Sequence, residues 1–395
     1  MLQRVHANAW LAEIEDGLDA LVATLAASAV QRDRAGGHAG PEKELLRQHG
    51  LLLLSVPQAH GGVGADWPAI LRIVRRIARV DSSLAHLLAF QHLQLSGVLA
   101  YGTPEQQARL LGETVAGQLW WGNAANPADP RLHAKEDGAG GLRLDGVKGF
   151  CSGARGSAKL ITSALLGDRF LIGVVATGSP GITIHDDWDP VGQRQTDSTS
   201  VSFADVRLAP ENVLFAPGQP STPFLSLRGV LAQLILVHLF LGIAEGAVAE
   251  ARHYTLTQSR PWATAGVARA ADDPYVVHRY AEMHLANRAA AALADEASQR
   301  FEDAWQQGAQ LDAVARGHAA VAAAEAKVLA HRAALGAGEN AFDVCGARAA
   351  RAQQGLDRFW RNARTHTLHD PVDYKLRDIG RWALDARLPE PSLYS

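Results

Sequence analysis

The chain has 395 residues and a formal net charge of -3 at neutral pH. This length exceeds one ordinary hydrophobic core, so we expect two or three domains packed together. The charge shows no basic bias, which argues against nucleic acid as a partner. The two cysteines, Cys151 and Cys345, cannot form a disulfide framework, and they fit a reducing, cytoplasmic compartment.

Neither a secretory leader nor a membrane span is expected. Acidic residues such as Glu13 and Asp16 interrupt the N-terminal segment, where a leader would be basic and then apolar. The most apolar run, residues 229–244, is shorter than a membrane span requires and contains Gln233 and His238. We interpret this run as a buried helix of a bundle, and we expect no association with a membrane.

Residues 1–118 are predicted to form a helical domain, because apolar residues recur at helical spacing. Helices are expected at 9–25, 42–54, 67–80 and 84–99, and from Pro104 onward. The segment Asp81-Ser82-Ser83 offers an N-cap for the fourth of these helices. That helix carries His86 and His92, and a histidine in an apolar helix is more often a core residue than a catalytic one.

Short strands and turns follow in residues 119–220, where we expect a small antiparallel β-barrel or sandwich. Strands are predicted at 142–145, 147–152, 160–166, 170–176, 181–184 and 199–203. Residues 221–395 return to helix, and four long helices with short links predict an antiparallel four-helix bundle. These helices are expected at 226–257, 274–307, 311–335 and 339–369. The fold class is therefore α+β.

A polar segment near the C-terminus, residues 360–371, is a candidate site. If its helix continues through Thr367, His366 and His369 lie on neighbouring surface at i and i+3, and Pro371 ends the helix near Asp370. A solvated helix end whose basic residues complement the helix dipole explains the segment equally well. No third ligand stands at a suitable spacing from the two histidines, so we predict no metal site.

The order helical domain, β-domain and helical bundle resembles the acyl-CoA dehydrogenase fold over nearly the whole chain. Within that superfamily, several segments look like the dibenzothiophene and dimethyl sulfone monooxygenases and related sulfur-acquisition oxidoreductases. These segments are residues 120–124, 186–194, 259–262, 271–274 and 361–371, whereas the wider superfamily resemblance rests on Pro57, Gly61-Gly62 and residues 102–106, 146–153 and 361–364.

The resemblance allows two chemistries. A dehydrogenase needs a carboxylate to take a proton from the substrate while a flavin takes a hydride. Where these enzymes carry Tyr and Glu, this chain has His369 and the shorter Asp370. An FAD-dependent acyl-CoA dehydrogenase with Asp370 as base is therefore the alternative hypothesis. A flavin-free scaffold is a third, and the retained polar residues argue against it.

A monooxygenase is the preferred hypothesis. The resemblance implies that reduced flavin, FMNH2 or FADH2, reacts with O2 through a C4a-(hydro)peroxyflavin to oxygenate a small organosulfur or aromatic substrate. It also implies that His92, Ser152 and His369 converge on the flavin ring, with His366 nearby. The Ser152 hydroxyl is assigned to the flavin N5 or the peroxide, and histidines suit proton transfer near neutral pH.

The resemblance further implies the residues that hold the cofactor, FMN or FAD. They are Trp121, Asn123, Ala124, Phe150, Cys151, Ser152, Arg260 and Arg364. Arg260 is expected to reach the flavin phosphate from a neighbouring subunit of a homotetramer. The chain has no Gly-x-Gly-x-x-Gly segment that opens a strand-helix unit, so a separate NAD(P)H flavin reductase is expected to supply the reduced flavin.

Overall fold

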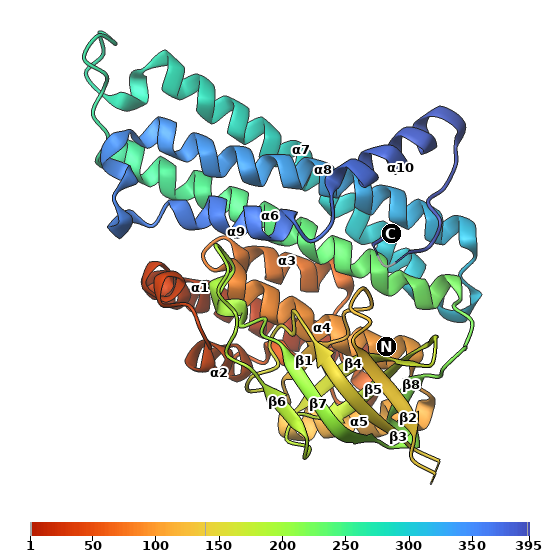
Figure 1. Cartoon of the computed structure of the whole chain (residues 1–395). Helices are drawn as coiled ribbons and strands as arrows, with labels where there is room; N and C mark the ends of the chain where they lie inside the picture. The colour runs from red at the N-terminus through yellow and green to blue at the C-terminus, as the bar shows by residue number, and fades with distance from the viewer. Residues whose placement is uncertain (1, 139, 393) are drawn as a thin grey trace.

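The computed structural model describes residues 2–138, 140–392 and 394–395. A bundle of long helices lies on one side of the molecule and a sheet on the other, with two N-terminal helices between them (Figure 1). The acyl-CoA dehydrogenase architecture expected from the sequence is confirmed, with helical N- and C-terminal parts and a sheet in the middle.

The described N-terminal part contains five α-helices, and side-chain caps begin the last three of them. They are α1 (Leu2–Ala35), α2 (Gly40–Gln48), α3 (Trp67–Ala78), α4 (Ser82–Tyr101) and α5 (Pro104–Gly117). The Asp81 carboxylate accepts the backbone N–H of Leu84, as its expected role as N-cap of α4 requires. Thr103 and Gln106 form a reciprocal capping box at the start of α5. The helix expected at 42–54 is shorter, because Gly50 adopts a left-handed conformation.

The middle sheet is mixed, and in this respect the prediction of a purely antiparallel domain was wrong. Its strands are β1 (Trp121–Ala124), β2 (Leu132–Glu136), β3 (Leu142–Lys148), β4 (Lys159–Leu166), β5 (Arg169–Ala176), β6 (Ile182–Ile184), β7 (Val201–Leu208) and β8 (Val213–Phe215). They follow the order β6-β7-β3-β2-β4-β5-β8, and β1 pairs with β4. Both β1 and β2 run parallel to β4. Parallel pairing joins strands distant in sequence, which strand-by-strand patterning does not reveal.

The C-terminal part is built on three helices of 33 to 35 residues, α6 (Pro223–Thr257), α7 (Pro274–Gln306) and α8 (Ala313–Cys345). Two shorter helices follow, α9 (Asp357–Thr367) and α10 (Val372–Asp385). The expected break between 335 and 339 was wrong, because α8 continues through Gly336 and Gly338. The α8 backbone meets Trp360 of α9 closely at Gly338, where an added Cβ would lie 3.0 Å from the Trp360 Cα.

Helix α6 is long and apolar enough to cross a membrane, but 83% of its most apolar window is buried inside the protein. It lies at the centre of the structure and packs against α3, α4, α7, α8 and α9. A helix that is apolar on all sides is expected in such a position. The burial agrees with our interpretation of residues 229–244 as a bundle core.

Candidate active site

Three parts of the chain meet around His86, which lies in the first half of α4. The His86 Nε2 is 3.0 Å from the Ser152 Oγ, in the turn that follows β3. The His86 ring also stacks on the ring of His366 in α9, with centroids 4.9 Å apart and planes 28° apart. All three side chains are buried. The N-terminal helices, the sheet and the bundle therefore each contribute one polar side chain to this cluster.

A chain of hydroxyl groups continues from Ser152. Its Oγ lies 2.7 Å from the Ser198 Oγ, which lies 2.8 Å from the Thr196 Oγ1. The Thr196 hydroxyl donates to the backbone carbonyl of Gln193. Each hydroxyl group can both donate and accept a hydrogen bond. The row of hydroxyl groups therefore fixes the position of the Ser152 oxygen, while the direction in which its proton points stays open.

Both imidazoles of the cluster are neutral near pH 7. Burial, followed by the nearby His369, lowers the pKa of His86 to about 3. Burial also lowers the pKa of His366 well below its ordinary value, and the neighbouring His86 and His369 act in the same direction. The Nδ1 atoms of His86 and His366 are buried and have no hydrogen-bond partner within the described chain. Such unsatisfied atoms are costly and point to a missing ligand or water.

The structure does not bring His92 to this cluster, so the expected convergence of His92 with Ser152 was wrong. The His92 Nδ1 is 2.8 Å from the Ser55 Oγ, and its Nε2 is 3.0 Å from the Leu51 carbonyl oxygen. The ring is 0% exposed, and burial lowers its pKa to about 4. Six residues turn an α-helix by about 240°, so His86 and His92 project from different sides of α4.

Helical spacing groups His86 with other residues of the site, although it does not show which face of α4 meets the sheet. Residues four apart lie on one helix face, and His86, Phe90 and Gln94 follow that spacing in α4. Phe90 stacks on His86 with a centroid distance of 4.0 Å. The Gln94 amide lies 3.4 Å from the Asn123 Oδ1 on β1. This face of α4 is turned toward the sheet and contains the polar residues that the site uses.

The two histidines of the C-terminal segment lie in different surroundings, because α9 ends at Thr367, before His369. The His369 side chain is 43% exposed, and its Nδ1 lies 3.1 Å from the Asp370 Oδ1. Its ring meets Tyr394 edge-on, at 5.5 Å between centroids. His366 is thus an interior residue of the cluster, whereas His369 stands at its margin.

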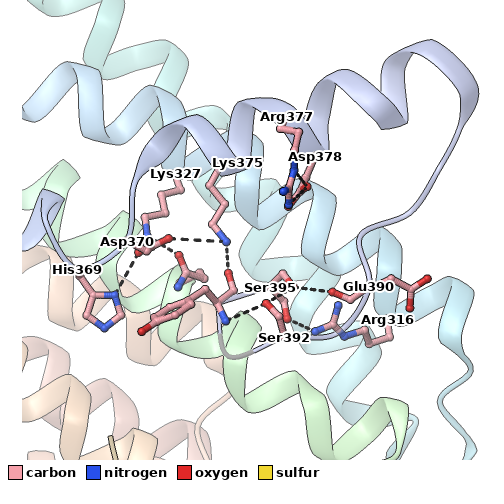
Figure 2. A network of polar contacts seen from close by, with 12 residues as sticks. Arg316, Lys327, His369, Asp370, Lys375, Arg377, Asp378, Glu390, Ser392 and Ser395 are labelled. Carbon is pink, nitrogen blue, oxygen red and sulfur yellow. Dashed lines mark hydrogen bonds and ion pairs between the residues drawn. The ribbon is translucent and has the colours of Figure 1, made fainter. Parts of the chain in front are cut away.

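Asp370 is held by two lysines (Figure 2). The buried Lys327 of α8 pairs with its Oδ1, and Lys375 of α10 lies 3.8 Å from its Oδ2. Burial opposes ionisation of Asp370, but the hydrogen bond to His369 and the charges of both lysines lower its pKa overall. A carboxylate so stabilised is a poor proton acceptor. The geometry therefore argues against Asp370 as the base of an acyl-CoA dehydrogenase.

The residues expected along the flavin ring lie on β1 and in the turn after β3. The Asn123 N–H donates to the Ser152 carbonyl, which joins the two segments at 3.0 Å. The Trp121 indole is instead a core group, because it is 2% exposed and donates to the Thr114 hydroxyl. Ala124 is also completely buried. Asn123 remains the polar side chain of β1 nearest to Ser152 in the hydrogen-bond network.

The turn itself places Phe150 and Cys151 differently. Phe150 has a φ of 58°, is 65% exposed and packs edge-on against Trp188 at 6.0 Å. A positive φ is uncommon for a bulky residue and is maintained by the surrounding contacts. Cys151 is completely buried, and burial raises the pKa of its thiol to about 12. Cys151 is therefore a packing residue with no thiolate at neutral pH.

The two arginines assigned to the flavin phosphate are exposed and lie outside the cluster. The Arg364 guanidinium donates to the Thr367 hydroxyl at 3.1 Å. Arg260 lies in the loop between α6 and α7. Phe240 of α6 contacts His366. Helix α6 continues for 17 more residues to Thr257, which lies about 26 Å further along the helix. Arg260 follows Thr257 and therefore cannot reach the cluster of its own chain. A phosphate role for Arg260 requires another subunit.

In the described part of the chain, no group of three or more His, Cys, Asp or Glu side chains is arranged to hold a metal ion. The cluster itself presents imidazoles, hydroxyls and backbone groups. Such a set can donate hydrogen bonds and exclude water from an organic cofactor, whose own chemistry it cannot replace.

Comparisons with known proteins agree with this architecture. The family "Acyl-CoA dehydrogenase, N-terminal domain" matches residues 12–118, and "Acyl-CoA dehydrogenase, C-terminal domain" matches residues 234–374. The chain is 45% identical to the "Probable FMNH2-dependent monooxygenase SfnC" of Pseudomonas putida, covering 95% of each chain. It is 40% identical to dibenzothiophene monooxygenase of Rhodococcus erythropolis, covering 93% of this chain and 92% of that one.

Solved structures give the same result. Methanesulfinate monooxygenase MsuC from Pseudomonas fluorescens superimposes with a TM-score of 0.94 at 45% identity, covering 96% of this chain and 99% of MsuC. FMN-bound TdsC from Paenibacillus sp. A11-2 superimposes with a TM-score of 0.93 at 37% identity, covering 97% and 100% of the two chains. The chain therefore belongs to the flavin-dependent monooxygenases of the acyl-CoA dehydrogenase family.

Proposed function

We propose that this protein uses reduced FMN and O2 to oxygenate a small organosulfur substrate. The observation that carries the proposal is the buried cluster of His86, Ser152 and His366 at the junction of three parts of the chain. SfnC is described as FMNH2-dependent, TdsC was solved with FMN, and MsuC is described as acting on methanesulfinate. The expected sulfur chemistry follows from these relatives.

The residues of the cluster fit a flavin. Two buried Nδ1 atoms, of His86 and His366, have no hydrogen-bond partner among the described residues, and neither has the buried Thr199 hydroxyl. A flavin carries ring nitrogens and carbonyl oxygens that can satisfy such groups, and when reduced it supplies the electrons that activate O2. Asn123, Phe150 and Ser152 lie on connected segments and would line one side of the ring.

We assign the proton handling at the site to His86, with Ser152 as its hydrogen-bond partner. A neutral imidazole can donate a proton at one nitrogen and accept one at the other. The Ser152 hydroxyl fixes one nitrogen of His86 and leaves Nδ1 to meet the ligand. His366 stacks against the same ring and excludes water from it. His369 and Asp370, at the margin, connect the cluster to the C-terminal residues.

Flavin binding is proposed to need a second subunit. Arg260 is exposed in the loop between α6 and α7, and a neighbouring copy would bring it to the phosphate of a flavin bound elsewhere. We therefore propose a homotetramer, located in the cytoplasm and supplied with reduced flavin by a separate NAD(P)H reductase. Arg260→Ala should weaken FMN binding, which fluorescence titration measures, and an unchanged affinity would remove Arg260 from the site.

Stopped-flow oxidation of protein-bound reduced FMN tests the function directly. With a flavin reductase and O2, the protein should convert methanesulfinate or dimethyl sulfone into an oxygenated product detected by mass spectrometry. His86→Ala provides a matched inactive variant, and His92→Ala is the control on the same helix. Oxidation of the flavin at the rate of free reduced FMN, with no oxygenated product from any organosulfur compound, would refute the proposal.

A further inference from the structure

Arg228, near the start of α6, is an interior arginine without an acidic partner. Its side chain is half-buried, and its Nε is buried with no hydrogen-bond partner in the described chain. Among the described residues, its side chain makes one hydrogen bond, of 3.0 Å to the Gln94 Oε1. Burial lowers the pKa of Arg228. A guanidinium in such surroundings is costly unless a partner pairs with it.

Other arginines in the structure have the acidic partner that Arg228 lacks among the described residues. Arg358 and Arg75 each pair with a glutamate, Glu250 and Glu245, and no ion pair to Arg228 is found among the described residues. A neutral amide, Gln94, compensates a full positive charge only weakly compared with an anion. The protein thus leaves an anion-binding group unsatisfied inside its fold.

Arg228 is connected to the candidate active site through two side chains. The Gln94 amide that it contacts reaches the Asn123 Oδ1 at 3.4 Å, and the Asn123 backbone N–H donates to the Ser152 carbonyl. Gln94 shares the face of α4 that carries His86, eight residues earlier and about 12 Å along the helix. His86, Gln94 and Asn123 thus form a row of polar side chains, which we call the polar row. Arg228 lies at its far end.

Helices α4 and α6 run antiparallel along this row. The Tyr101 hydroxyl at the end of α4 donates to the Leu225 carbonyl at the start of α6, while His366 joins His86 to Phe240 further along α6. Gly97 leaves the space beside Arg228 free of an α4 side chain, since an added Cβ would lie 3.6 Å from the Arg228 Nε. Arg228 therefore reaches the C-terminal half of α4 from the bundle helix α6.

We propose that Arg228 binds the anionic end of the substrate and that this substrate is a small sulfur oxyanion, such as an alkanesulfinate. A guanidinium presents parallel N–H donors that match the two oxygens of a sulfinate. With a flavin against Asn123 and Ser152, as proposed above, a substrate anion at the α6 end of the polar row would meet Arg228. The inference rests on the proposed monooxygenase function and names the substrate class of the same site.

The test compares wild-type protein with Arg228→Met and Arg228→Lys on a charged and an uncharged substrate. With reductase, FMN and O2, Arg228→Met should raise the KM for methanesulfinate about 10- to 100-fold, the loss expected for a charge-assisted hydrogen bond. Arg228→Lys should recover part of that loss. The KM for the neutral dimethyl sulfone should change less than threefold. Arg72→Met, at an exposed position of α3, is the matched control.

Direct binding measurements test the role of Arg228 even if turnover is slow. Isothermal titration of the FMN-loaded protein with methanesulfinate should show binding that Arg228→Met removes, and fluorescence titration should give an unchanged FMN affinity. Equal weakening of FMN binding would make Arg228 a flavin ligand and overturn the inference. Absence of sulfinate binding to wild-type protein, or sulfinate binding that is indifferent to Arg228, would also overturn it. Loss of all oxygenation in wild-type protein would instead refute the proposed function.

Discussion

The imidazole of His86 and the hydroxyl of Ser152 lie 3.0 Å apart, although 66 positions separate them in the chain. The contact joins α4 to the turn after β3, and His366 of α9 stacks against its outer side. Polar groups that three regions of the chain hold in place and shield from water can stabilise the charge that develops during a reaction.

His86→Ala should lower the rate of coupled oxygenation about 100-fold or more, because it removes the proposed proton-handling group beside Ser152. Hydrogen peroxide release should rise as oxygenation falls. Product formation and peroxide are measured together in the reductase-coupled assay. Full coupled turnover in the variant would exclude His86 from the chemistry.

His92→Ala should act on stability and leave chemistry intact. The change leaves the Ser55 hydroxyl and the Leu51 carbonyl without their partner, at a cost of about 1–3 kcal/mol for each group. Urea denaturation should show the lower free energy of unfolding, and the folded variant should retain the wild-type turnover number. A selective loss of activity at unchanged stability would contradict our placement of His92 in the core.

Asp370→Asn should destabilise the protein by about 3–5 kcal/mol, because Lys327 is left as a buried charge without its partner. The double variant Asp370→Leu with Lys327→Met removes both charges and should recover much of this loss. Chemical denaturation of the three proteins provides the measurement. A destabilisation of the single variant below 1 kcal/mol would show that Lys327 is neutral or solvated.

Acid should destabilise the fold below a pH of about 6.5. Burial lowers the pKa of His238 to about 3 and that of His92 to about 4, against about 6.5 for an unfolded chain. Below pH 6.5 the unfolded state therefore binds the proton first, and stability falls as pH falls. Each such histidine contributes up to about 1.4 kcal/mol per pH unit until its folded-state pKa is reached.

His238→Leu should reduce the slope of the free energy of unfolding against pH between pH 4 and 6.5 by the contribution of one histidine. The free energy of unfolding is measured at several pH values for each protein. Parallel curves for wild type and His238→Leu would contradict the assignment.

Two glycines in long helices should respond oppositely to alanine. At Gly246 of α6 an added Cβ would lie 2.0 Å from the Arg79 carbonyl oxygen, so Gly246→Ala should force the helices apart and lower the melting temperature. At Gly336 of α8 an added Cβ would meet no described atom within 4 Å beyond its own helix backbone, so Gly336→Ala should stabilise the helix by up to about 1 kcal/mol. Calorimetry of the two variants measures both effects, and equal signs would contradict the packing.

The sequence by itself determined the architecture and the boundaries of many elements. Apolar spacing identified the long helices, and Asp81 and Thr103 marked the starts of α4 and α5, because caps and periodicity are local properties. Ser152 and His366 were also named from sequence, and the structure places both in one cluster.

Only the tertiary structure decided which histidine of α4 belongs to the site, since His86 and His92 have similar neighbours in sequence and differ in the side of the helix from which they project. It also showed Asp370 held between Lys327 and Lys375, and Arg228 without an acid. Ionisation and hydrogen bonding depend on groups far apart in the chain, and folding alone brings those groups together.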